Sequence, residues 1–290
     1  MDWIDERALL DAAPAGRLTP GHALRVGRRP RHPQMPMAPD LDRVRIRLIQ
    51  IRTRAEVLAE ERASFQKRTG LAATNILPSN AIDETITTDW LDDVDAVMIG
   101  GAGAYSVTQT YDWTPALIDL CHVCADRQLP LFGSCWGHQF VARAFGGEVV
   151  HDPTRAEMGT HRVSLTDAGR LDPLFSTLPE TFGTQMGHQD RVARLPDGAV
   201  ELASNARAPY QAFRLGDAPI YGTQFHSELD AETERQRLIA YRDHYPEMAG
   251  DAEFSAVIDA LYETPDADDL LRRFLLLFAV EDGAERLAAG

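Results

Sequence analysis

The chain has 290 residues, of which 44% are hydrophobic and 25% charged, a composition typical of a globular protein with a large core. Its 44 acidic residues outnumber its 29 basic residues, and the net charge of -15 disfavours binding to nucleic acid or to anionic membrane surfaces. No apolar run approaches the roughly 20 residues that span a bilayer, and the N-terminus is acidic where a signal peptide would be basic. We therefore expect a cytoplasmic protein with neither a nucleic acid nor a membrane as its partner.

The N-terminal 42 residues differ in composition from the rest of the chain. Pro, Gly and Arg crowd the stretch GRLTPGHALRVGRRPRHPQMPMAPD, which lacks apolar periodicity. Such a composition favours a flexible arm over a folded element. We therefore predict an N-terminal extension over residues 1–42 and a single domain over residues 43–285, with Met35 or Met37 as alternative natural starts.

Regular structure is expected to begin at RVRIRLIQI, where Ile46 and Leu48 alternate with Arg as in a strand. In the next stretch Thr53 and Glu56 have the spacing of a capping box and Gly70 is a typical helix end, so we predict a helix. Strands at DAVMIGG and LPLFGS, a helix over residues 112–127 and a helix from Trp136 repeat this alternation. The pattern indicates an α/β fold with a parallel sheet covered by helices on both faces.

The pattern changes after Gly147, where short β-type runs are separated by turns. These runs favour antiparallel strands and hairpins added to the sheet. Three helices are predicted to end the chain, at AETERQRLIAYRDHY, EFSAVIDALYE and ADDLLRRFLLLFAVE. The last has an apolar face that should pack against the domain.

Two of the three cysteines, Cys121 and Cys124, have the CxxC spacing found in zinc and thioredoxin-like sites. No second pair of Cys or His residues follows at the spacing of metal ligands, and both cysteines lie on the apolar face of a predicted helix. We interpret them as core residues and predict neither a metal nor another cofactor. The odd cysteine count fits a reducing compartment.

The third cysteine, Cys135, lies in FGSCWGHQF, where a predicted strand turns into a helix between Gly133 and Gly137. Small residues permit a sharp elbow that exposes the side chain, and the amides of the following helix favour a thiolate. A G-x-C-x-G pattern is a weak signal alone, and a buried structural cysteine is an equal alternative.

Ninety residues later, the predicted strand YGTQFH is followed by Glu228. His226 can serve as the base for Cys135, and Glu228 can hold the imidazole in its useful tautomer.

A thiolate that attacks a carbonyl also needs hydrogen-bond donors for the developing oxyanion. In MIGGAGAYSV a buried strand ends at Gly100, and the following residues Gly101, Ala102 and Gly103 can present backbone amides. The Trp136 amide can supply a second donor. Phosphate binding is the alternative for this turn, but the Lys-Ser/Thr of a P-loop and the G-x-G-x-x-G spacing are both missing from it.

Together these segments resemble the class I (triad) glutamine amidotransferases, and among them the glutaminase part of GMP synthase and its stand-alone relatives. GSCWGHQ is similar to the family's G-x-C-x-G-x-Q, QFHSE to its Q-F-H-P-E, and IGGAGAYS to its glycine-rich oxyanion turn. MGHQD is similar to a histidine-containing segment between them. The resemblance runs from Val44 to Glu228 and implies a three-layer, flavodoxin-like sandwich with a mostly parallel central sheet and added antiparallel strands.

The resemblance also implies roles for individual residues. Cys135 would attack the side-chain amide of L-glutamine, His226 would protonate the leaving ammonia, and Glu228 would orient His226. The glutamine would be bound by Gln139, Gly187, His188 and Gln189. For His188 and Asp190 a buried hydrogen-bonded pair is the alternative, and Glu157 is expected to be structural.

Ser227 departs from the family's proline, and Gly187 and Gln189 depart from the small polar and glycine residues common at their positions. Nothing after Glu228 resembles an ATP-pyrophosphatase domain, so ammonia delivery would require a separate ATP-dependent synthetase subunit. Two alternatives remain: a hydrolase of γ-glutamyl peptides or γ-glutamyl amines with the same triad, and a non-catalytic binding protein. The oligomeric state does not follow from the sequence.

Overall fold

The computed structural model describes residues 41–244 and 250–280. Nearly all of the predicted arm over residues 1–42 lies outside this part of the chain, as does the predicted domain end at residue 285. The strands are β1 (Ile46–Gln50), β2 (Ile76–Asn80), β3 (Ala96–Ile99), β4 (Leu131–Ser134), β5 (Glu148–His151), β6 (Glu157–Leu165), β7 (Thr181–His188), β8 (Asp190–Arg194), β9 (Ala199–Ser204), β10 (Ala212–Leu215) and β11 (Ile220–Thr223). The α-helices are α1 (Ala55–Thr69), α2 (Thr114–Asp126), α3 (Trp136–Ala144), α4 (Asp167–Leu171), α5 (Ala231–Ala240), α6 (Asp251–Asp259) and α7 (Leu270–Phe278).

Nine strands form the central sheet in the order β2-β1-β3-β4-β11-β10-β9-β6-β7. The five strands from β2 to β11 are parallel, and the remaining pairings are antiparallel. This confirms the α/β fold with added antiparallel strands. Strands β5 and β8 form a separate two-stranded sheet, so these two segments do not extend the central sheet as expected.

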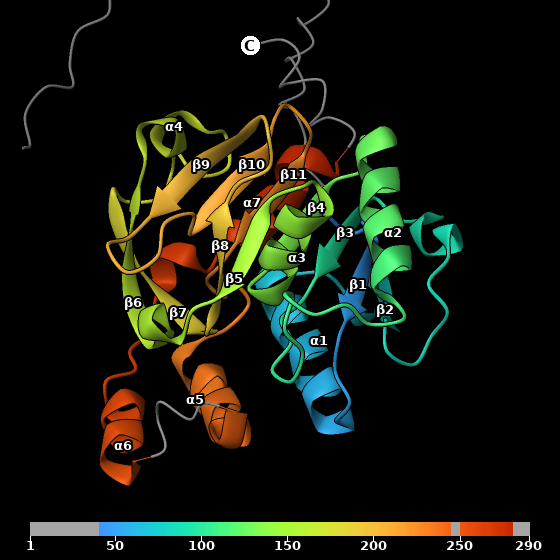
Figure 1. The fold of residues 1–290 in the computed structure, drawn as a ribbon. Helices are drawn as coiled ribbons and strands as arrows, with labels where there is room; N and C mark the ends of the chain where they lie inside the picture. Colours follow the sequence, from blue (N-terminus) through green and yellow to red (C-terminus); the bar gives the residue numbers. More distant parts are fainter. Residues whose placement is uncertain (1–40, 245–249, 281–290) are drawn as a thin grey trace, which may run out of the picture. The chain divides into compact units, whose positions relative to one another are not determined.

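Helices cover both faces of the sheet, because the buried parallel strands carry apolar side chains on each face. On one face Phe65 of α1 and Phe274 of α7 join a core that includes Ile46 and Phe132. On the other face α2 and α3 pack over Ile99 and its neighbours. Figure 1 shows α2 and α3 in front of the sheet and α7 behind it. The three-layer arrangement confirms the predicted sandwich.

The start of α1 differs from the sequence-based expectation. The N-cap is Arg54, which makes no side-chain capping bond, so the predicted capping box of Thr53 and Glu56 is wrong. Glu56 instead forms an exposed ion pair with Arg54 at 2.6 Å, and this pair competes with the capping contact. The predicted helix end is confirmed, because Gly70 adopts the left-handed conformation at φ 73°.

The CxxC pair lies on the buried face of α2. Cys121 and Cys124 are each 1% exposed and belong to the apolar core beneath that helix. Both are free thiols, and burial raises the pKa of Cys124 to about 12. Their environment is that of core residues.

Among the described residues, no helix combines the length and apolar character that crossing a lipid bilayer demands.

Candidate active site

Two neighbouring parallel strands bring the distant sequence segments together. Strand β4 pairs with β11 so that Ser134 lies opposite Thr223, and the amide of Cys135 donates to the Thr223 carbonyl at 2.8 Å. Because parallel strands end at the same edge of a sheet, the residues that follow β4 and β11 meet there. Cys135 follows the first strand directly, and His226 follows the second after two residues.

Cys135 occupies a strained elbow between β4 and α3. Its backbone has φ 50° and ψ -99°, a region that non-glycine residues rarely adopt. The turn depends on two glycines: a Cβ at Gly133 would lie 2.5 Å from the backbone of Gly137, and a Cβ at Gly137 would overlap the carbonyl oxygen of Ile99. The strain is therefore maintained by close packing of α3 against β3 and β4, which holds the thiol at the sheet edge.

His226 and Glu228 form a short, buried polar contact at this edge. The imidazole Nδ1 lies 2.6 Å from Glu228 Oε1, and both side chains are buried. Ser134, the last residue of β4, donates to Glu228 Oε2 at 2.6 Å. The segment also bonds to the antiparallel part of the sheet, because the amide of His226 donates to the carbonyl of Gln185 at 2.9 Å. The carboxylate and the backbone together fix the orientation of the imidazole.

The electrostatics of the pair favour charged partners. Burial disfavours the imidazolium, but the Glu228 carboxylate and the neighbouring Cys135 raise the pKa of His226 well above its ordinary value of 6.5. For Glu228, burial raises the pKa, but His226, Arg237 and the Ser134 hydroxyl outweigh that effect and lower it to about 2. A protonated His226 beside Cys135 is the arrangement that a cysteine nucleophile needs.

Glu228 also belongs to a buried network of ion pairs that the sequence did not predict. Arg237 of α5 lies 3.4 Å from Glu228 Oε1 and 3.0 Å from Glu60. Arg52, which follows β1, pairs with buried Glu61 at 2.9 Å. The only sequence signal for these residues is the presence of charges among apolar neighbours, and such a pattern also fits solvent-exposed positions.

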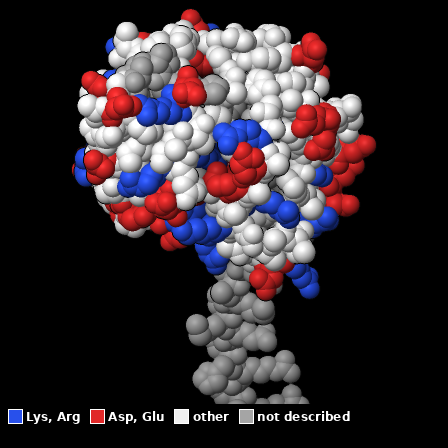
Figure 2. Space-filling model, turned by 90° about the horizontal axis from the view of Figure 1, so that it is seen from below, with Lys and Arg blue, Asp and Glu red and all other residues white. Residues whose placement is uncertain are grey.

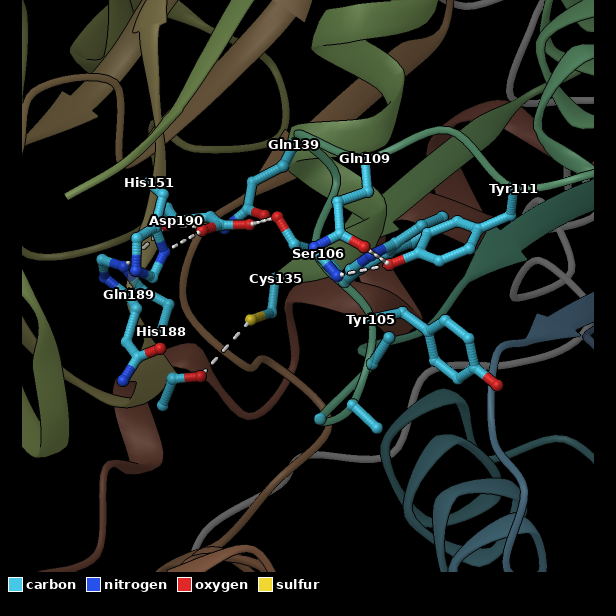
Figure 3. A pocket seen from close by; sticks show the side chains of 15 residues that line it. Tyr105, Ser106, Gln109, Tyr111, Cys135, Gln139, His151, His188, Gln189 and Asp190 are labelled. Carbon is cyan, nitrogen blue, oxygen red and sulfur yellow. Dashed lines mark hydrogen bonds and ion pairs between the residues drawn. The ribbon is translucent and has the colours of Figure 1, made fainter. Parts of the chain in front are cut away.

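A cavity of about 230 Å³ opens beside the Cys135 thiol. The predicted residues Ala102, Gly103, Trp136, Gln139, Gly187, His188 and Gln189 all line it. Further lining residues, which the sequence motifs did not predict, come from the loop after β3 and from β5: Tyr105, Ser106, Gln109, Tyr111 and His151. In Figure 3, Cys135 lies between His151, His188 and Gln189 on one side and Tyr105, Gln109 and Tyr111 on the other. The thiol sulfur lies 3.9 Å from the Gly187 carbonyl oxygen and 3.8 Å from the Gln224 side-chain nitrogen.

The predicted oxyanion turn lies against the edge of the sheet that carries Cys135 and His226. A Cβ at Gly101 would lie 3.1 Å from His226 Cε1, so this glycine permits a close approach of the turn to the imidazole. The amide of Gly100 donates to the Ile49 carbonyl at 3.0 Å and belongs to the sheet, so it is no candidate oxyanion donor. Trp136 is the first residue of α3, where helix geometry leaves the amide without an intrahelical acceptor.

The polar residues of the cavity bond to one another. The side-chain nitrogen of Gln139 donates to the Asp190 carbonyl at 2.7 Å. His188 contacts that same carbonyl at 3.1 Å and Glu157 at 3.3 Å. His188 and Asp190 therefore meet through the Asp190 backbone, whereas the Asp190 carboxylate contacts Ser106 at 2.5 Å and His151 at 2.8 Å. Glu157 also accepts from Asn205 and Gln211, as expected for a structural residue.

Comparison with known proteins agrees with this geometry. The family model described as glutamine amidotransferase class-I matches residues 63–242, more than half of the chain. A GMP synthase [glutamine-hydrolyzing] from Thermosipho africanus is 41% identical over 104 residues, which cover 36% of this chain and 19% of that protein. A GMP synthase [glutamine-hydrolyzing] subunit from Sulfolobus acidocaldarius is 33% identical over 166 residues, which cover 56% of this chain and 79% of that protein.

Solved structures support the same fold. A crystal structure of a glutamine amidotransferase from Thermotoga maritima matches with a TM-score of 0.60 and 20% identity, over 79% of this chain and 96% of that one. The sequence match covers only about a fifth of the Thermosipho enzyme but most of the Sulfolobus subunit. Because the family model spans more than half of the chain, the chain belongs to the class I glutamine amidotransferases.

Proposed function

We propose that this protein hydrolyses the side-chain amide of L-glutamine through a thioester on Cys135 and releases ammonia. One observation carries the proposal: the hydrogen-bonded pair of His226 and Glu228 meets the strained Cys135 elbow at one edge of the sheet. A thiol, a base and a carboxylate that orients the base are the three groups that cysteine-dependent acyl transfer requires.

The reaction proceeds in two steps. Cys135 Sγ forms a bond to the amide carbon, and backbone amides near Gly103 and at Trp136 stabilise the oxyanion. His226 gives its proton to the amide nitrogen, the carbon–nitrogen bond breaks, and ammonia leaves. Water then loses a proton to His226 and attacks the thioester carbon. The sulfur–carbon bond breaks to release glutamate and restore the Cys135 thiolate.

The amino-acid end of glutamine would occupy the cavity of about 230 Å³ beside Cys135. Gln139, Gly187, His188 and Gln189 line this cavity and are the proposed binding residues. The Asp190 carboxylate also lines it and has the charge that attracts an α-ammonium group. Because Gln139 already donates to the Asp190 backbone, its role is to hold the wall of the cavity as well as to contact substrate.

The fate of the ammonia is a further part of the proposal. The Sulfolobus relative is named as a subunit of a GMP synthase, which favours a separate ATP-dependent synthetase as the acceptor of ammonia from this chain. Hydrolysis of a γ-glutamyl peptide or amine is the second candidate. The observation that favours it is the extent of the cavity, which continues from Cys135 to Tyr105 and Tyr111.

The test combines active-site labelling with turnover. Intact-mass measurement after treatment with a glutamine-like chloroketone should reveal one adduct on the wild-type protein and none on Cys135→Ser. Cys124→Ala is the matched control, because that thiol is buried in α2, and it should be labelled like the wild type. Ammonia release from glutamine is compared with release of amines from γ-glutamyl compounds. Unlabelled wild-type protein, together with hydrolysis unaffected by Cys135→Ser, would refute the nucleophile assignment.

A further inference from the structure

A second, smaller cavity lies on the His226 side of Cys135. It measures about 30 Å³ and shares Ala102, Gly103, Cys135 and Gly187 with the larger one. His226 lines only the smaller cavity, and Gln139 and His188 line only the larger. The remaining walls of the smaller cavity are Arg52, Glu234, Arg237, Leu238 and Tyr241. Cys135 therefore lines both a space of substrate size and a smaller space adjoining the imidazole.

Two residues that line this cavity, Glu234 and Arg237, each have a buried polar atom with no hydrogen-bond partner among the described residues. Oε1 of Glu234 is an acceptor, and Nη2 of Arg237 is a donor. The two side chains come from successive turns of α5 and are 1% and 8% exposed. Arg237 Nη2 lies 3.7 Å from Glu61 Oε1, which is an ion pair but too long for a hydrogen bond. Unsatisfied buried groups are costly, so an unpaired acceptor and an unpaired donor on two residues that line one cavity point to a bound molecule.

The size and polarity of the cavity define that molecule. A volume of about 30 Å³ holds one molecule of the size of water and excludes glutamine. The molecule must accept a bond from Arg237 and donate one to Glu234. Water and ammonia both meet these requirements, and both take part in the proposed reaction.

We propose that this small cavity binds the molecule exchanged at the thioester, either departing ammonia or entering water, and that Glu234 and Arg237 hold it beside His226. The inference rests on the proposed glutaminase function. Ammonia arrives after His226 has protonated the amide nitrogen and the carbon–nitrogen bond has broken. Water leaves the site when its proton passes to His226, its oxygen bonds to the thioester carbon, and the sulfur takes back the electron pair of the sulfur–carbon bond.

The electrostatic environment of Glu234 is consistent with a neutral molecule, water or ammonia, in the small cavity. Burial raises its pKa to about 7, and the nearby cations His226 and Arg237 offset only part of that effect. Within residues 41–244 and 250–280, Glu234 forms no ion pair, unlike Glu61 and Glu228 beside it. A merely structural carboxyl at such a buried position would be expected to have a fixed partner.

The experiment uses the full chain and the variants Glu234→Leu and Glu234→Gln. Glu232→Gln is the matched control, because Glu232 lies on the same helix with its side chain 65% exposed. Three quantities are measured: Cys135 labelling by the chloroketone, ammonia release from glutamine, and partition of the glutamyl thioester between water and added hydroxylamine. We expect Glu234→Leu to lower hydrolysis about tenfold, the worth of one hydrogen bond, and to leave labelling unchanged.

The partition of the thioester between water and hydroxylamine shows whether the small cavity holds water or ammonia. If the cavity positions water, the glutamyl-enzyme accumulates in the mass spectrum and the product shifts toward the hydroxamate. If it accepts ammonia, thioester formation slows and the partition stays as in the wild type. Glu234→Gln should keep or raise the melting temperature, because it removes an unpaired buried carboxyl.

Two outcomes overturn the inference and leave the proposed function intact. In one, Glu234→Leu hydrolyses glutamine like Glu232→Gln and the wild type. In the other, the labelling of Cys135 falls in parallel with hydrolysis, which would mean that Glu234 acts only on the reactivity or position of Cys135. A wild-type protein that neither reacts with the chloroketone nor releases ammonia would instead refute the proposed function itself.

Discussion

Glu228 is the residue on which the charged contacts of the site converge. Its carboxylate contacts His226 and Ser134 at 2.6 Å each and Arg237 at 3.4 Å. Charge-assisted hydrogen bonds of this kind are stronger than neutral ones and fix geometry as well as charge. The position of His226 is therefore determined by a carboxylate that is itself held from three sides.

Replacing Glu228 with Gln should reduce kcat/KM for glutamine by roughly 10² to 10⁴, because His226 loses the charge that raises its pKa, and an amide, which can also donate, no longer fixes its tautomer. The pH at which Cys135 labelling is half-maximal should also change, since the imidazolium loses its partner. Steady-state kinetics and a pH series of the labelling rate measure both effects.

Glu157→Gln is the matched control for that variant, because Glu157 is a second buried carboxylate that contacts a histidine, His188. It should lose stability, since Asn205 and Gln211 also donate to it. Its pH profile of labelling should stay that of the wild type. An equal change of profile in both variants would contradict the assigned role of Glu228.

At the scale of elements, the junction of β4 and α3 determines where Cys135, the proposed nucleophile, lies. Substituting Ala at Gly137 should destabilise the fold by about 3 kcal/mol or more, because the new Cβ overlaps the carbonyl oxygen of Ile99 in β3. Urea unfolding measures the loss. Gly146→Ala is the control: its φ is 88°, but nothing lies within 4 Å of the added Cβ. It should cost only about 1 kcal/mol, and equal losses in the two variants would refute the packing argument.

Helix α5 brings Glu234 and Arg237 to the site, and its first turn is capped. The Asp230 side chain accepts from the amide of Thr233 and pairs with Lys67 at 2.6 Å. Asp230→Ala should cost about 1 kcal/mol in the free energy of unfolding, and Asp230→Asn should retain most of the capping contribution. Thermal unfolding of the two variants distinguishes the stabilisation by the helix cap from that by the ion pair with Lys67. The ion pair is largely exposed and contributes little to stability. Equal destabilisation in both would argue against a capping role.

At the scale of the whole molecule, charges of both signs are mixed over the surface. Figure 2 shows Lys and Arg interspersed with Asp and Glu on one face. Exposed pairs such as Arg54 with Glu56 contribute little to stability. The buried network around Glu228 is screened much less by solvent and salt. The pH dependence of stability should therefore reflect buried carboxylates more than the surface.

The free energy of unfolding should fall as the pH drops from about 4.5 to about 2, partly because of Glu228. Its folded-state pKa of about 2 lies below the ordinary 4.5, so its stabilisation is present above the unfolded-state pKa and is lost as pH falls through the folded-state value. Urea unfolding at several pH values measures the slope. Glu228→Gln should have a shallower slope in this window, and exposed Glu232→Gln should follow the wild type. Identical slopes in all three proteins would contradict the shift.

Much of the fold follows from local pattern. Apolar runs such as DAVMIGG alternate with amphipathic stretches, and this alternation predicts a parallel sheet between helices. The prediction is possible because the spacing of apolar residues along the chain reflects which side chains a strand or a helix buries. The same pattern predicts Cys135, His226 and Glu228 at strand ends. It failed at the capping box of α1, where Arg54 pairs with Glu56, and at β5 and β8, which pair with each other. The first depends on which neighbouring side chain Glu56 contacts, and the second on a pairing between segments about forty residues apart.

The sequence by itself determined the family, the order of the strands along the chain and the identity of the candidate triad, because motifs at strand ends retain their spacing. Only the tertiary structure decided which residues surround that triad. Ser134 reaches Glu228 from a variable position of the cysteine motif, whereas Arg237, which also reaches Glu228, and Glu234, which lines a second cavity, lie outside the motifs. Strand order in the sheet and the docking of α5 depend on the packing of the whole chain. Contacts between side chains distant in sequence therefore emerge only when the layers are assembled.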